Sequence, residues 1–374
     1  MANPLNQLRE LGQSIWLDYI RRDLFDGELA RLIEEDDLAG MTSNPTIFDA
    51  AISDSDLYDE DIRSAGSGVE PDVVFERLAV ADVQRAADHF RPLYDSTEGK
   101  DGFVSIEVRP SLANDTDGTV EEVRRLWAAC DRPNVMVKIP GTYEGLPAIS
   151  ECLLEGININ ITLLFSVNRY HEVMDAWFAA LEKRVDRHLP VDRVASVASF
   201  FVSRVDSMVD KRLDQVIEAE TGDKRELAER LKGQIAIANA RLAYEAFEER
   251  VQAPRFAALA AAGARVQRPL WASTSTKNPA YPDIYYVDSL IGPETVNTLP
   301  PKTLDAFRDH GDPVVRIYEN RKECHEMIGE LGHVGIDFDD VTEELEREGV
   351  SKFAASYDQL LETIRREQRL VQTA

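Results

Sequence analysis

Short β-rich runs alternate with amphipathic helical patterns along almost the whole chain, and this alternation restricts the possible folds most strongly. Helical patterns include residues 23–36, 72–91, 119–130, 144–154 and 167–187. Alternating strands and helices indicate a parallel sheet covered by helices, and eight such units predict a (β/α)8 TIM barrel. We expect its strands at residues 14–19, 38–44, 102–108, 134–140, 159–166, 194–202, 268–274 and 283–291.

The connections between these runs are uneven in length. Residues 49–101 and 203–262 read as helical insertions, because structureless loops of this length are unusual. Residues from about 316 to 370 are again helical by pattern and could fold back over the barrel. No internal repeat or long Pro/Gly/Ser linker divides the chain. We therefore expect residues 1–374 to form a single elaborated barrel domain with additional outer helices and a helical C-terminal tail.

Composition limits the partners of this chain. Its net charge is −26 at pH 7 and its pI is about 4.6, so nucleic acids and anionic membranes would be repelled. Adaptation to high salt is an alternative explanation of this acidity. The cysteines Cys130, Cys152 and Cys324 form no CxxC motif, and the N-terminus has no signal-peptide pattern. These features predict a cytoplasmic protein that does not span a membrane, and the oligomeric state could be a monomer or a homodimer.

One lysine lies in the middle of an apolar run. In Asn134-Val-Met-Val-Lys-Ile-Pro140, Val135, Val137 and Ile139 share one face of the predicted strand, and Met136 and Lys138 share the other. A strand lysine on a solvent-exposed edge is the ordinary alternative. A strand that is buried on both faces would instead desolvate Lys138, and burial favours the neutral amine that attacks carbonyl groups.

Polar side chains recur at or just after the ends of the other predicted strands. A barrel gathers such residues around one mouth, even when they are far apart in the sequence. Each also has a structural alternative, since carboxylates can cap helices, Asn44 can form a turn and Arg204 can pair with Asp206 or Asp210. Besides Lys138, the set comprises Asp18, Asn44, Glu107, Asn160, Thr162, Ser199, Arg204, Ser273 and Lys277.

Several local strings resemble those of the transaldolase family, and the resemblance extends from about residue 13 to 310. It is closest to the longer bacterial form, in which Trp-Ala-Ser-Thr precedes a lysine and an Asn-Pro pair. The strings are Thr42-Ser-Asn-Pro-Thr-Ile-Phe48, Val104-Ser-Ile-Glu-Val108, Val135-Met-Val-Lys-Ile-Pro140, Gly156-Ile-Asn-Ile-Asn-Ile-Thr-Leu-Leu-Phe-Ser166 and Trp271-Ala-Ser-Thr274.

The resemblance implies a class I aldol mechanism without a cofactor. Lys138 would form a Schiff base with a ketose phosphate. Asp18 would accept the proton of the C4 hydroxyl, and Glu107 and Thr162 would position a water molecule that helps imine formation. The implied reaction transfers dihydroxyacetone from sedoheptulose 7-phosphate or fructose 6-phosphate to glyceraldehyde 3-phosphate or erythrose 4-phosphate, in the non-oxidative pentose phosphate pathway.

The same resemblance implies a substrate-binding set. Asn44 and Asn160 would bind the dihydroxyacetone hydroxyls, and Phe201 would exclude water. The sugar phosphate would be bound by Ser199, Arg204, Ser273 and Lys277. Shorter members of the family place an arginine soon after the serine of the seventh strand, whereas Thr-Ser-Thr precedes Lys277 in this chain.

Two other functions remain open at this stage. A simple aldolase would release free dihydroxyacetone; related fructose-6-phosphate aldolases carry tyrosine or glutamine among the water-positioning residues, where this chain has Glu107. A non-catalytic sugar-phosphate-binding barrel is the second alternative. No metal site is expected, because His171-Glu172 lacks the second histidine of HExxH, and no nucleotide-binding glycine motif is present.

Overall fold

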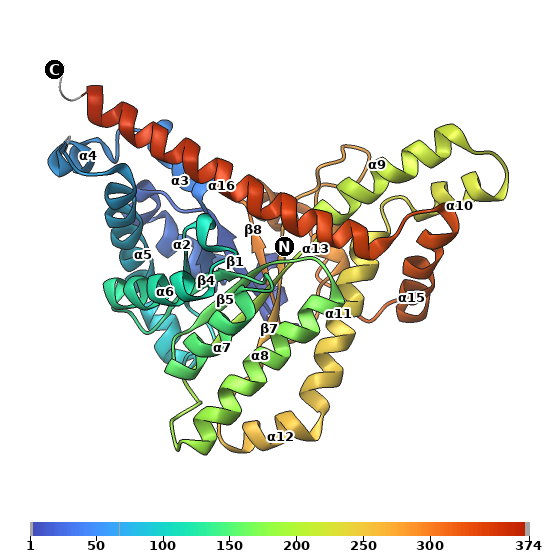
Figure 1. Cartoon of the computed structure of the whole chain (residues 1–374), viewed down its shortest axis with the longest axis horizontal. Coiled ribbons are helices and arrows are strands. Elements are labelled where there is room, and N and C mark those ends of the chain that lie inside the picture. The colour runs from blue at the N-terminus through green and yellow to red at the C-terminus, as the bar shows by residue number, and fades with distance from the viewer. Residues whose placement is uncertain (1–2, 67, 371–374) are drawn as a thin grey trace.

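A closed parallel barrel with its strands in sequence order forms the centre of the molecule (Figure 1). The computed structural model describes residues 3–66 and 68–370. The predicted (β/α)8 TIM barrel is confirmed. The strands are β1 (Gln13–Asp18), β2 (Gly40–Thr42), β3 (Phe103–Glu107), β4 (Val135–Pro140), β5 (Ile159–Leu164), β6 (Ser196–Phe201), β7 (Arg268–Ala272) and β8 (Thr295–Leu299).

Helices surround this barrel. The short helices are η1 (Arg22–Asp26), η2 (Pro110–Leu112) and η3 (Leu331–Val334). The α-helices that precede β6 are α1 (Pro4–Glu10), α2 (Glu28–Glu35), α3 (Pro45–Ser53), α4 (Asp59–Ala65), α5 (Pro71–Ser96), α6 (Thr116–Cys130), α7 (Gly145–Glu155) and α8 (Val167–Asp186). Those that follow it are α9 (Ser203–Ala219), α10 (Asp223–Leu231), α11 (Ile235–Gln252), α12 (Pro254–Ala261), α13 (Tyr285–Ser289), α14 (Pro301–His310), α15 (Arg321–Glu330) and α16 (Phe338–Leu370).

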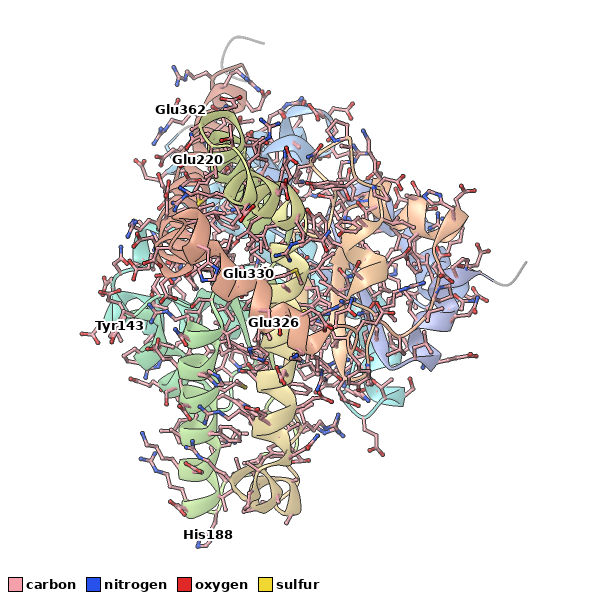
Figure 2. All side chains as sticks on the ribbon, turned by 90° about the vertical axis from the view of Figure 1, so that its right-hand side faces the viewer. Tyr143, His188, Glu220, Glu326, Glu330 and Glu362 are labelled. Atoms are coloured by element: carbon pink, nitrogen blue, oxygen red, sulfur yellow. The ribbon has the colours of Figure 1, made fainter. Side chains whose placement is uncertain are left out.

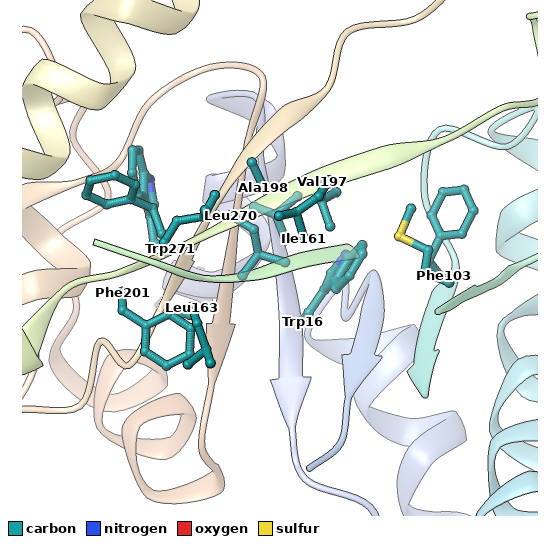
Figure 3. Packing of buried hydrophobic residues seen from close by; sticks show 14 of the residues in the cluster. Trp16, Phe103, Ile161, Leu163, Val197, Ala198, Phe201, Leu270 and Trp271 are labelled. Carbon is teal, nitrogen blue, oxygen red and sulfur yellow. The ribbon is translucent and has the colours of Figure 1, made fainter. Parts of the chain in front are cut away.

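The strands are buried on both faces, as their apolar composition requires. Every residue of β4 is buried, including Lys138, so this strand is not an exposed edge. Aliphatic and aromatic side chains pack together in the core, where the Trp16 and Phe103 ring centroids are 6.4 Å apart (Figure 3). Covering helices are needed to bury the outer faces of such strands.

The predicted eighth strand at residues 283–291 is wrong. This segment contains the short helix α13, and β8 lies at Thr295–Leu299 instead. A short run rich in Tyr, Val, Leu and Ile cannot be distinguished from a helix by its composition alone. The actual strand has no apolar signature, because Thr295, Asn297 and Thr298 give it a polar sequence although all of its residues are buried.

The C-terminal helix α16 passes α3 at one end and α9 at the other (Figure 1). Thr46 Oγ1 donates a hydrogen bond to Ser356 Oγ at 2.9 Å, and Thr363 Oγ1 donates to Asp49 Oδ1 at 2.6 Å. Gly349 lies so close to Leu163 that an added Cβ would be 3.0 Å from a leucine methyl group. The tail therefore packs on the C-terminal ends of the strands. That residues 1–374 form a single domain stays a prediction.

Charged side chains cover much of the outside of the molecule; Figure 2 labels Glu362 and Glu220 near its upper edge and Glu326 and Glu330 on the face toward the viewer. Many form ion pairs, such as Arg230 Nη2 with Glu330 Oε1 at 2.7 Å. Among the described helices, none is both long enough and apolar enough to cross a membrane.

Candidate active site

A cavity of about 350 Å³ opens at the C-terminal ends of the strands. All the predicted site residues line it except Glu107 and Asn160. The strand register explains this convergence: Lys138 is the partner of Glu107 on β3 and of Asn160 on β5. In a parallel barrel, residues at the same level on neighbouring strands present their side chains to the same side.

Lys138 is 6% exposed, and its Nζ lies near Ser43, near Glu107 of β3 and near the C-terminal helix. Nζ donates a hydrogen bond to the Ser43 carbonyl oxygen at 3.2 Å and lies 3.6 Å from Glu107 Oε2. The ring centroid of Phe353, from α16, is 5.9 Å from Nζ. The amine therefore lies at the cavity floor, with one carboxylate and one aromatic ring close to it.

Glu107 is buried at the end of β3. Burial raises the pKa of its carboxyl group to about 7, although the nearby Lys138 lowers it. Its Oε2 has no hydrogen-bond partner among the described residues, and buried polar atoms are usually partnered. Glu107 also lines a second cavity of about 30 Å³ with Ser43 and Asn44, which is room for about two water molecules. This carboxyl group can therefore exchange a proton with Lys138 or with water near neutral pH.

Asp18 ends β1 and belongs to a chain of hydroxyl groups. Thr42 Oγ1 donates to Asp18 Oδ1 at 2.8 Å and lies 2.6 Å from Thr298 Oγ1. Because the Thr42 hydrogen points to Asp18, Thr298 is the donor in the second bond. Burial raises the pKa of Asp18, while Lys138 and the Thr42 hydrogen bond lower it. The two threonines thus fix the orientation of a carboxyl group suited to accepting a proton.

Thr162 lies where β5 departs from regular pairing. The register with β6 shifts between Ile161 and Leu164, and Leu163 has a φ of +61°. Positive φ is strained for a leucine, and such strain is concentrated near functional sites. The buried Oγ1 of Thr162 has no hydrogen-bond partner among the described residues. The bulge leaves this hydroxyl group free to bind a ligand or water.

Asn160 and Ser199 form a buried network under the cavity. Ser199 Oγ donates to Asn160 Oδ1 at 2.7 Å, and Asn160 Nδ2 donates to Ser105 Oγ at 3.0 Å. Ser199 reaches the cavity, whereas Asn160 is fully buried beside Lys138. One N–H of the Asn160 amide has no partner in these bonds, so the amide can still donate toward a group bound to the lysine.

Asn44 caps a helix, where the sequence suggested a turn, and its role in binding substrate stays a prediction. Its Oδ1 accepts a hydrogen bond from the Ile47 backbone N–H at 3.1 Å and thereby caps α3. It also lines the cavity, where its Nδ2 group is available as a donor. Helix capping therefore fixes the side chain in the position from which it can bind a hydroxyl group.

Arg204 lies in the first turn of α9, and its guanidinium carbon is 5.1 Å from the ring centroid of Phe201. Phe201 also packs on Phe165, with ring centroids 5.3 Å apart. Among the described residues no carboxylate lies within 4.0 Å of Arg204, so the suggested pairs with Asp206 and Asp210 do not form. Burial lowers the pKa of Arg204, yet a guanidinium remains charged. This cation is available for an anionic substrate.

Ser273 and Lys277 follow β7 on an irregular loop. Ser273 has a φ of +56°, and its Oγ lies 3.1 Å from Ser203 Oγ. Lys277 Nζ donates to Ser275 Oγ at 2.6 Å and reaches the cavity, although much of its side chain is exposed. Two cations therefore lie at one side of the cavity in a strongly acidic protein.

Several cavity residues were missed by sequence reasoning. Thr298 was lost with the wrong position of β8, and Phe353 is about two hundred residues from Lys138 in the chain, so no local pattern connects them. Thr42 stands directly before the Ser-Asn pair and could have been found as a polar strand end. The others that line the cavity are Thr46, Ile47, Ala272, Ser275 and Pro300. Across the described residues, no group of three or more His, Cys, Asp or Glu side chains could hold a metal ion.

Comparison with known proteins identifies the family. A family model described as transaldolase/fructose-6-phosphate aldolase matches residues 15–364. A transaldolase of Acidothermus cellulolyticus is 50% identical over 371 residues, which cover 98% of this chain and 97% of the relative. Transaldolases of Frankia alni and Thermobifida fusca are 49% and 48% identical, and each alignment covers 97% of this chain and 97% or 98% of the relative. The predicted resemblance is confirmed, and this chain belongs to the transaldolase/fructose-6-phosphate aldolase family.

Proposed function

We propose that this protein is a transaldolase that transfers a dihydroxyacetone unit between sugar phosphates through a Schiff base on Lys138. The donor is sedoheptulose 7-phosphate or fructose 6-phosphate, and the acceptor is glyceraldehyde 3-phosphate or erythrose 4-phosphate. The observation that carries this proposal is the burial of Lys138 at the cavity floor, 3.6 Å from Glu107.

The first half of the reaction forms the imine. The neutral amine of Lys138 attacks the ketose carbonyl carbon, and loss of water from the carbinolamine leaves a protonated imine. Glu107, with a pKa of about 7, can donate the proton that converts the hydroxyl group into water. The free hydroxyl group of Thr162 orients the water molecule through which Glu107 acts.

The second half cleaves the carbon chain. Asp18 removes the proton of the C4 hydroxyl group, the C3–C4 bond breaks, and its electron pair moves into the protonated imine to give an enamine. The aldose phosphate leaves, and the enamine then attacks the acceptor aldehyde by the reverse steps. Asn44 and Asn160 bind the hydroxyl groups of the retained three-carbon unit, and Phe201 limits access of water.

The phosphate group binds where Arg204 and Lys277 reach the cavity. Arg204 supplies a guanidinium fork, Lys277 adds a second charge, and Ser273 offers a hydroxyl group. Ser199 joins this set when its hydroxyl hydrogen turns from Asn160 to the phosphate. This local positive charge offsets the repulsion that a protein of net charge −26 exerts on a sugar phosphate.

We place the enzyme in the cytoplasm, in the non-oxidative pentose phosphate pathway, as a monomer or homodimer that binds no nucleic acid. The reaction as written requires neither a metal nor an organic cofactor. The acidic composition supports the absence of nucleic-acid binding, and three cysteines without a CxxC motif support a reducing compartment.

Borohydride trapping tests the lysine. Reduction in the presence of fructose 6-phosphate should attach a dihydroxyacetone unit to the peptide that contains Lys138. Lys138→Arg should be inactive, because its guanidinium remains protonated and cannot attack. An adduct on another lysine would overturn the assignment.

A product assay distinguishes transfer from simple cleavage. Fructose 6-phosphate and erythrose 4-phosphate should yield sedoheptulose 7-phosphate and glyceraldehyde 3-phosphate in the presence of EDTA, and fructose 6-phosphate alone should give little turnover. Rapid release of dihydroxyacetone without an acceptor would favour a fructose-6-phosphate aldolase. No turnover and no trapped adduct would favour a non-catalytic binding protein.

A further inference from the structure

A group of buried tyrosines and aspartates lies beside the cavity but does not line it. Asp206 and Asp210 follow Arg204 along α9, and they are 1% and 8% exposed. Tyr281 and Tyr286 come from the connection between β7 and β8, which also carries Lys277. We call these four residues the tyrosine–aspartate clamp.

Every carboxylate oxygen of the clamp has a partner. Asp210 Oδ2 accepts from Tyr281 Oη at 2.7 Å, and its Oδ1 accepts from the Gly233 backbone N–H at 2.9 Å. Asp206 Oδ2 accepts from Tyr286 Oη at 2.9 Å, and its Oδ1 accepts from the Ala236 backbone N–H at 2.7 Å. The bonds to Gly233 and Ala236 hold the turn before α11, which is an ordinary structural role. The bonds to the two tyrosines instead join α9 to the loop after β7.

The loop that carries Lys277 is fixed to α9 at both ends. At one end, the Ser203 backbone N–H donates to the Ser273 carbonyl oxygen at 3.0 Å, at the start of the helix. At the other end, Tyr281 binds Asp210, seven residues further along α9 and therefore about 10 Å away. Lys277 is four residues after Ser273 and four before Tyr281. It therefore lies at the middle of a segment whose two ends depend on the helix that carries Arg204.

This segment is too long to be held by its ends alone. Eight residues can span up to about 27 Å, well beyond the separation of the anchors, so the loop folds back on itself. The ring of Tyr281 packs on Gly233, where an added Cβ would be 2.7 Å from a ring carbon. Without the Tyr281 anchor, the next contacts of this segment with other elements are Asp283 Oδ1 with His310 Nε2 at 2.9 Å and Tyr285 Oη with the Gly233 carbonyl oxygen at 3.0 Å. Inside the loop, Thr276 Oγ1 still donates to the Pro282 carbonyl oxygen at 2.7 Å. A longer free segment would allow Lys277 to leave the position beside Arg204.

We propose that the Tyr281–Asp210 hydrogen bond is a positioning device that sets the preference of the enzyme for phosphorylated substrates by holding Lys277 beside Arg204. This inference rests on the proposed function of the cavity. Neither residue touches the substrate. Their effect should therefore appear in binding of the phosphate group and not in the chemistry at Lys138.

Tyr281→Phe removes one hydroxyl group and tests the clamp with little change of volume. The KM for fructose 6-phosphate should rise about tenfold, as expected for a lost hydrogen bond to a charged group. The kcat at saturation, the kcat/KM for unphosphorylated fructose and borohydride trapping with dihydroxyacetone should stay unchanged. Tyr285→Phe is the matched control, because Tyr285 Oη binds the Gly233 carbonyl oxygen at 3.0 Å and no carboxylate. This control should keep the wild-type preference.

A double-mutant cycle with Asp210→Asn separates coupling from general damage. In the Asp210→Asn background, Tyr281→Phe should add little further loss of phosphate preference. Full additivity, or an unchanged preference in Tyr281→Phe, would overturn the proposal. Thermal unfolding shows whether each variant folds. If Tyr281→Phe does not fold, Asp210→Asn serves as the single-variant test in its place.

Binding of inorganic phosphate, measured by calorimetry, separates the clamp from the proposed function. Tyr281→Phe should weaken phosphate binding about as much as it raises the KM, and Tyr285→Phe should not. If the wild-type protein transfers no dihydroxyacetone but Tyr281→Phe still weakens phosphate binding, the transaldolase assignment fails and the clamp stands. If transfer is normal and phosphate binding is equal in all three proteins, the clamp fails alone.

Discussion

At the scale of single residues, Asp18 and Glu107 are two buried carboxyl groups near one lysine, but their surroundings differ. Asp18 is oriented by the Thr298–Thr42 hydroxyl chain, whereas Glu107 Oε2 lies near Lys138 and has no hydrogen-bond partner among the described residues. A fixed carboxyl group suits removal of one substrate proton, and an unbound one suits exchange with water.

This difference predicts separable defects. Asp18→Ala should still form a trapped imine but should cleave it about 10²- to 10⁴-fold more slowly, because the C4 hydroxyl group loses its base. Glu107→Ala should form the imine slowly. Single-turnover kinetics with borohydride quenching measures both steps. Equal loss of both steps in both variants would show that the two roles are assigned wrongly.

Asp206 makes the stability of the protein depend on pH. Burial raises its pKa from an ordinary value of 3.8 to about 7, although its hydrogen bonds lower it. Between these two pH values the folded protein holds a proton that the unfolded chain has lost. The free energy of unfolding should therefore fall, through this group, as the pH rises from about 4 to 7.

Denaturant unfolding across this pH range checks the sign. The wild-type protein should lose more stability with rising pH than Asp206→Asn, whose amide does not titrate. Glu107→Gln should reduce the slope in the same direction, because burial also raises the pKa of Glu107 to about 7. Parallel curves for the wild type and Asp206→Asn would contradict a raised pKa at this position.

At the scale of secondary-structure elements, α16 brings a distant part of the chain to the reacting amine. Phe353 lines the cavity and lies over Lys138, and Gly349 allows close contact with Leu163 at the β5 bulge. An aromatic ring at this position shields the amine and the enamine from bulk water.

Phe353→Ala should therefore increase hydrolytic loss of the three-carbon unit. With fructose 6-phosphate alone, the variant should release more dihydroxyacetone than the wild type, and the yield of transfer per cleavage should fall. Phe353→Leu, which keeps an apolar side chain, is the matched control and should stay close to the wild type. If Phe353→Ala changes only the thermal stability, the helix is a structural cover without a role in excluding water.

The elements also show where sequence reasoning succeeds. The strands β1 to β7 were predictable because their apolar runs reflect burial on both faces, and their ends then located Asp18, Glu107 and Lys138. The polar strand β8 lacked this signal, so Thr298 and its bond to Thr42 were out of reach. Asn160 does not reach the cavity surface, because it is held by hydrogen bonds to Ser105 and Ser199. These bonds join separate strands and could not be predicted from the sequence. The first failure comes from the composition of one strand, and the second from contacts between separate strands.

At the scale of the whole molecule, the net charge of −26 opposes compact folding, whereas many ion pairs across the surface favour it. The two effects respond differently to salt. The nitrogen and oxygen atoms of an ion pair lie within about 4 Å of each other, so salt screens their attraction only weakly. Each exposed pair contributes only about 0–1 kcal/mol to stability. The repulsion acts over longer distances, beyond the Debye length of about 10 Å at 0.1 M ionic strength. Screening should therefore remove more repulsion than attraction.

The thermal unfolding midpoint at pH 7.5 should consequently rise when sodium chloride increases from about 10 mM to 200 mM, over which range the Debye length falls from about 30 Å to less than 10 Å. A stability gain of about 1 kcal/mol corresponds to a rise of roughly 2 °C in a chain of this size. The same titration near the pI of about 4.6 is the control, because the net charge there is close to zero and the midpoint should hardly change. A midpoint that falls with salt at pH 7.5 would mean that the surface ion pairs, and not the excess of carboxylates, determine the electrostatic balance of this fold.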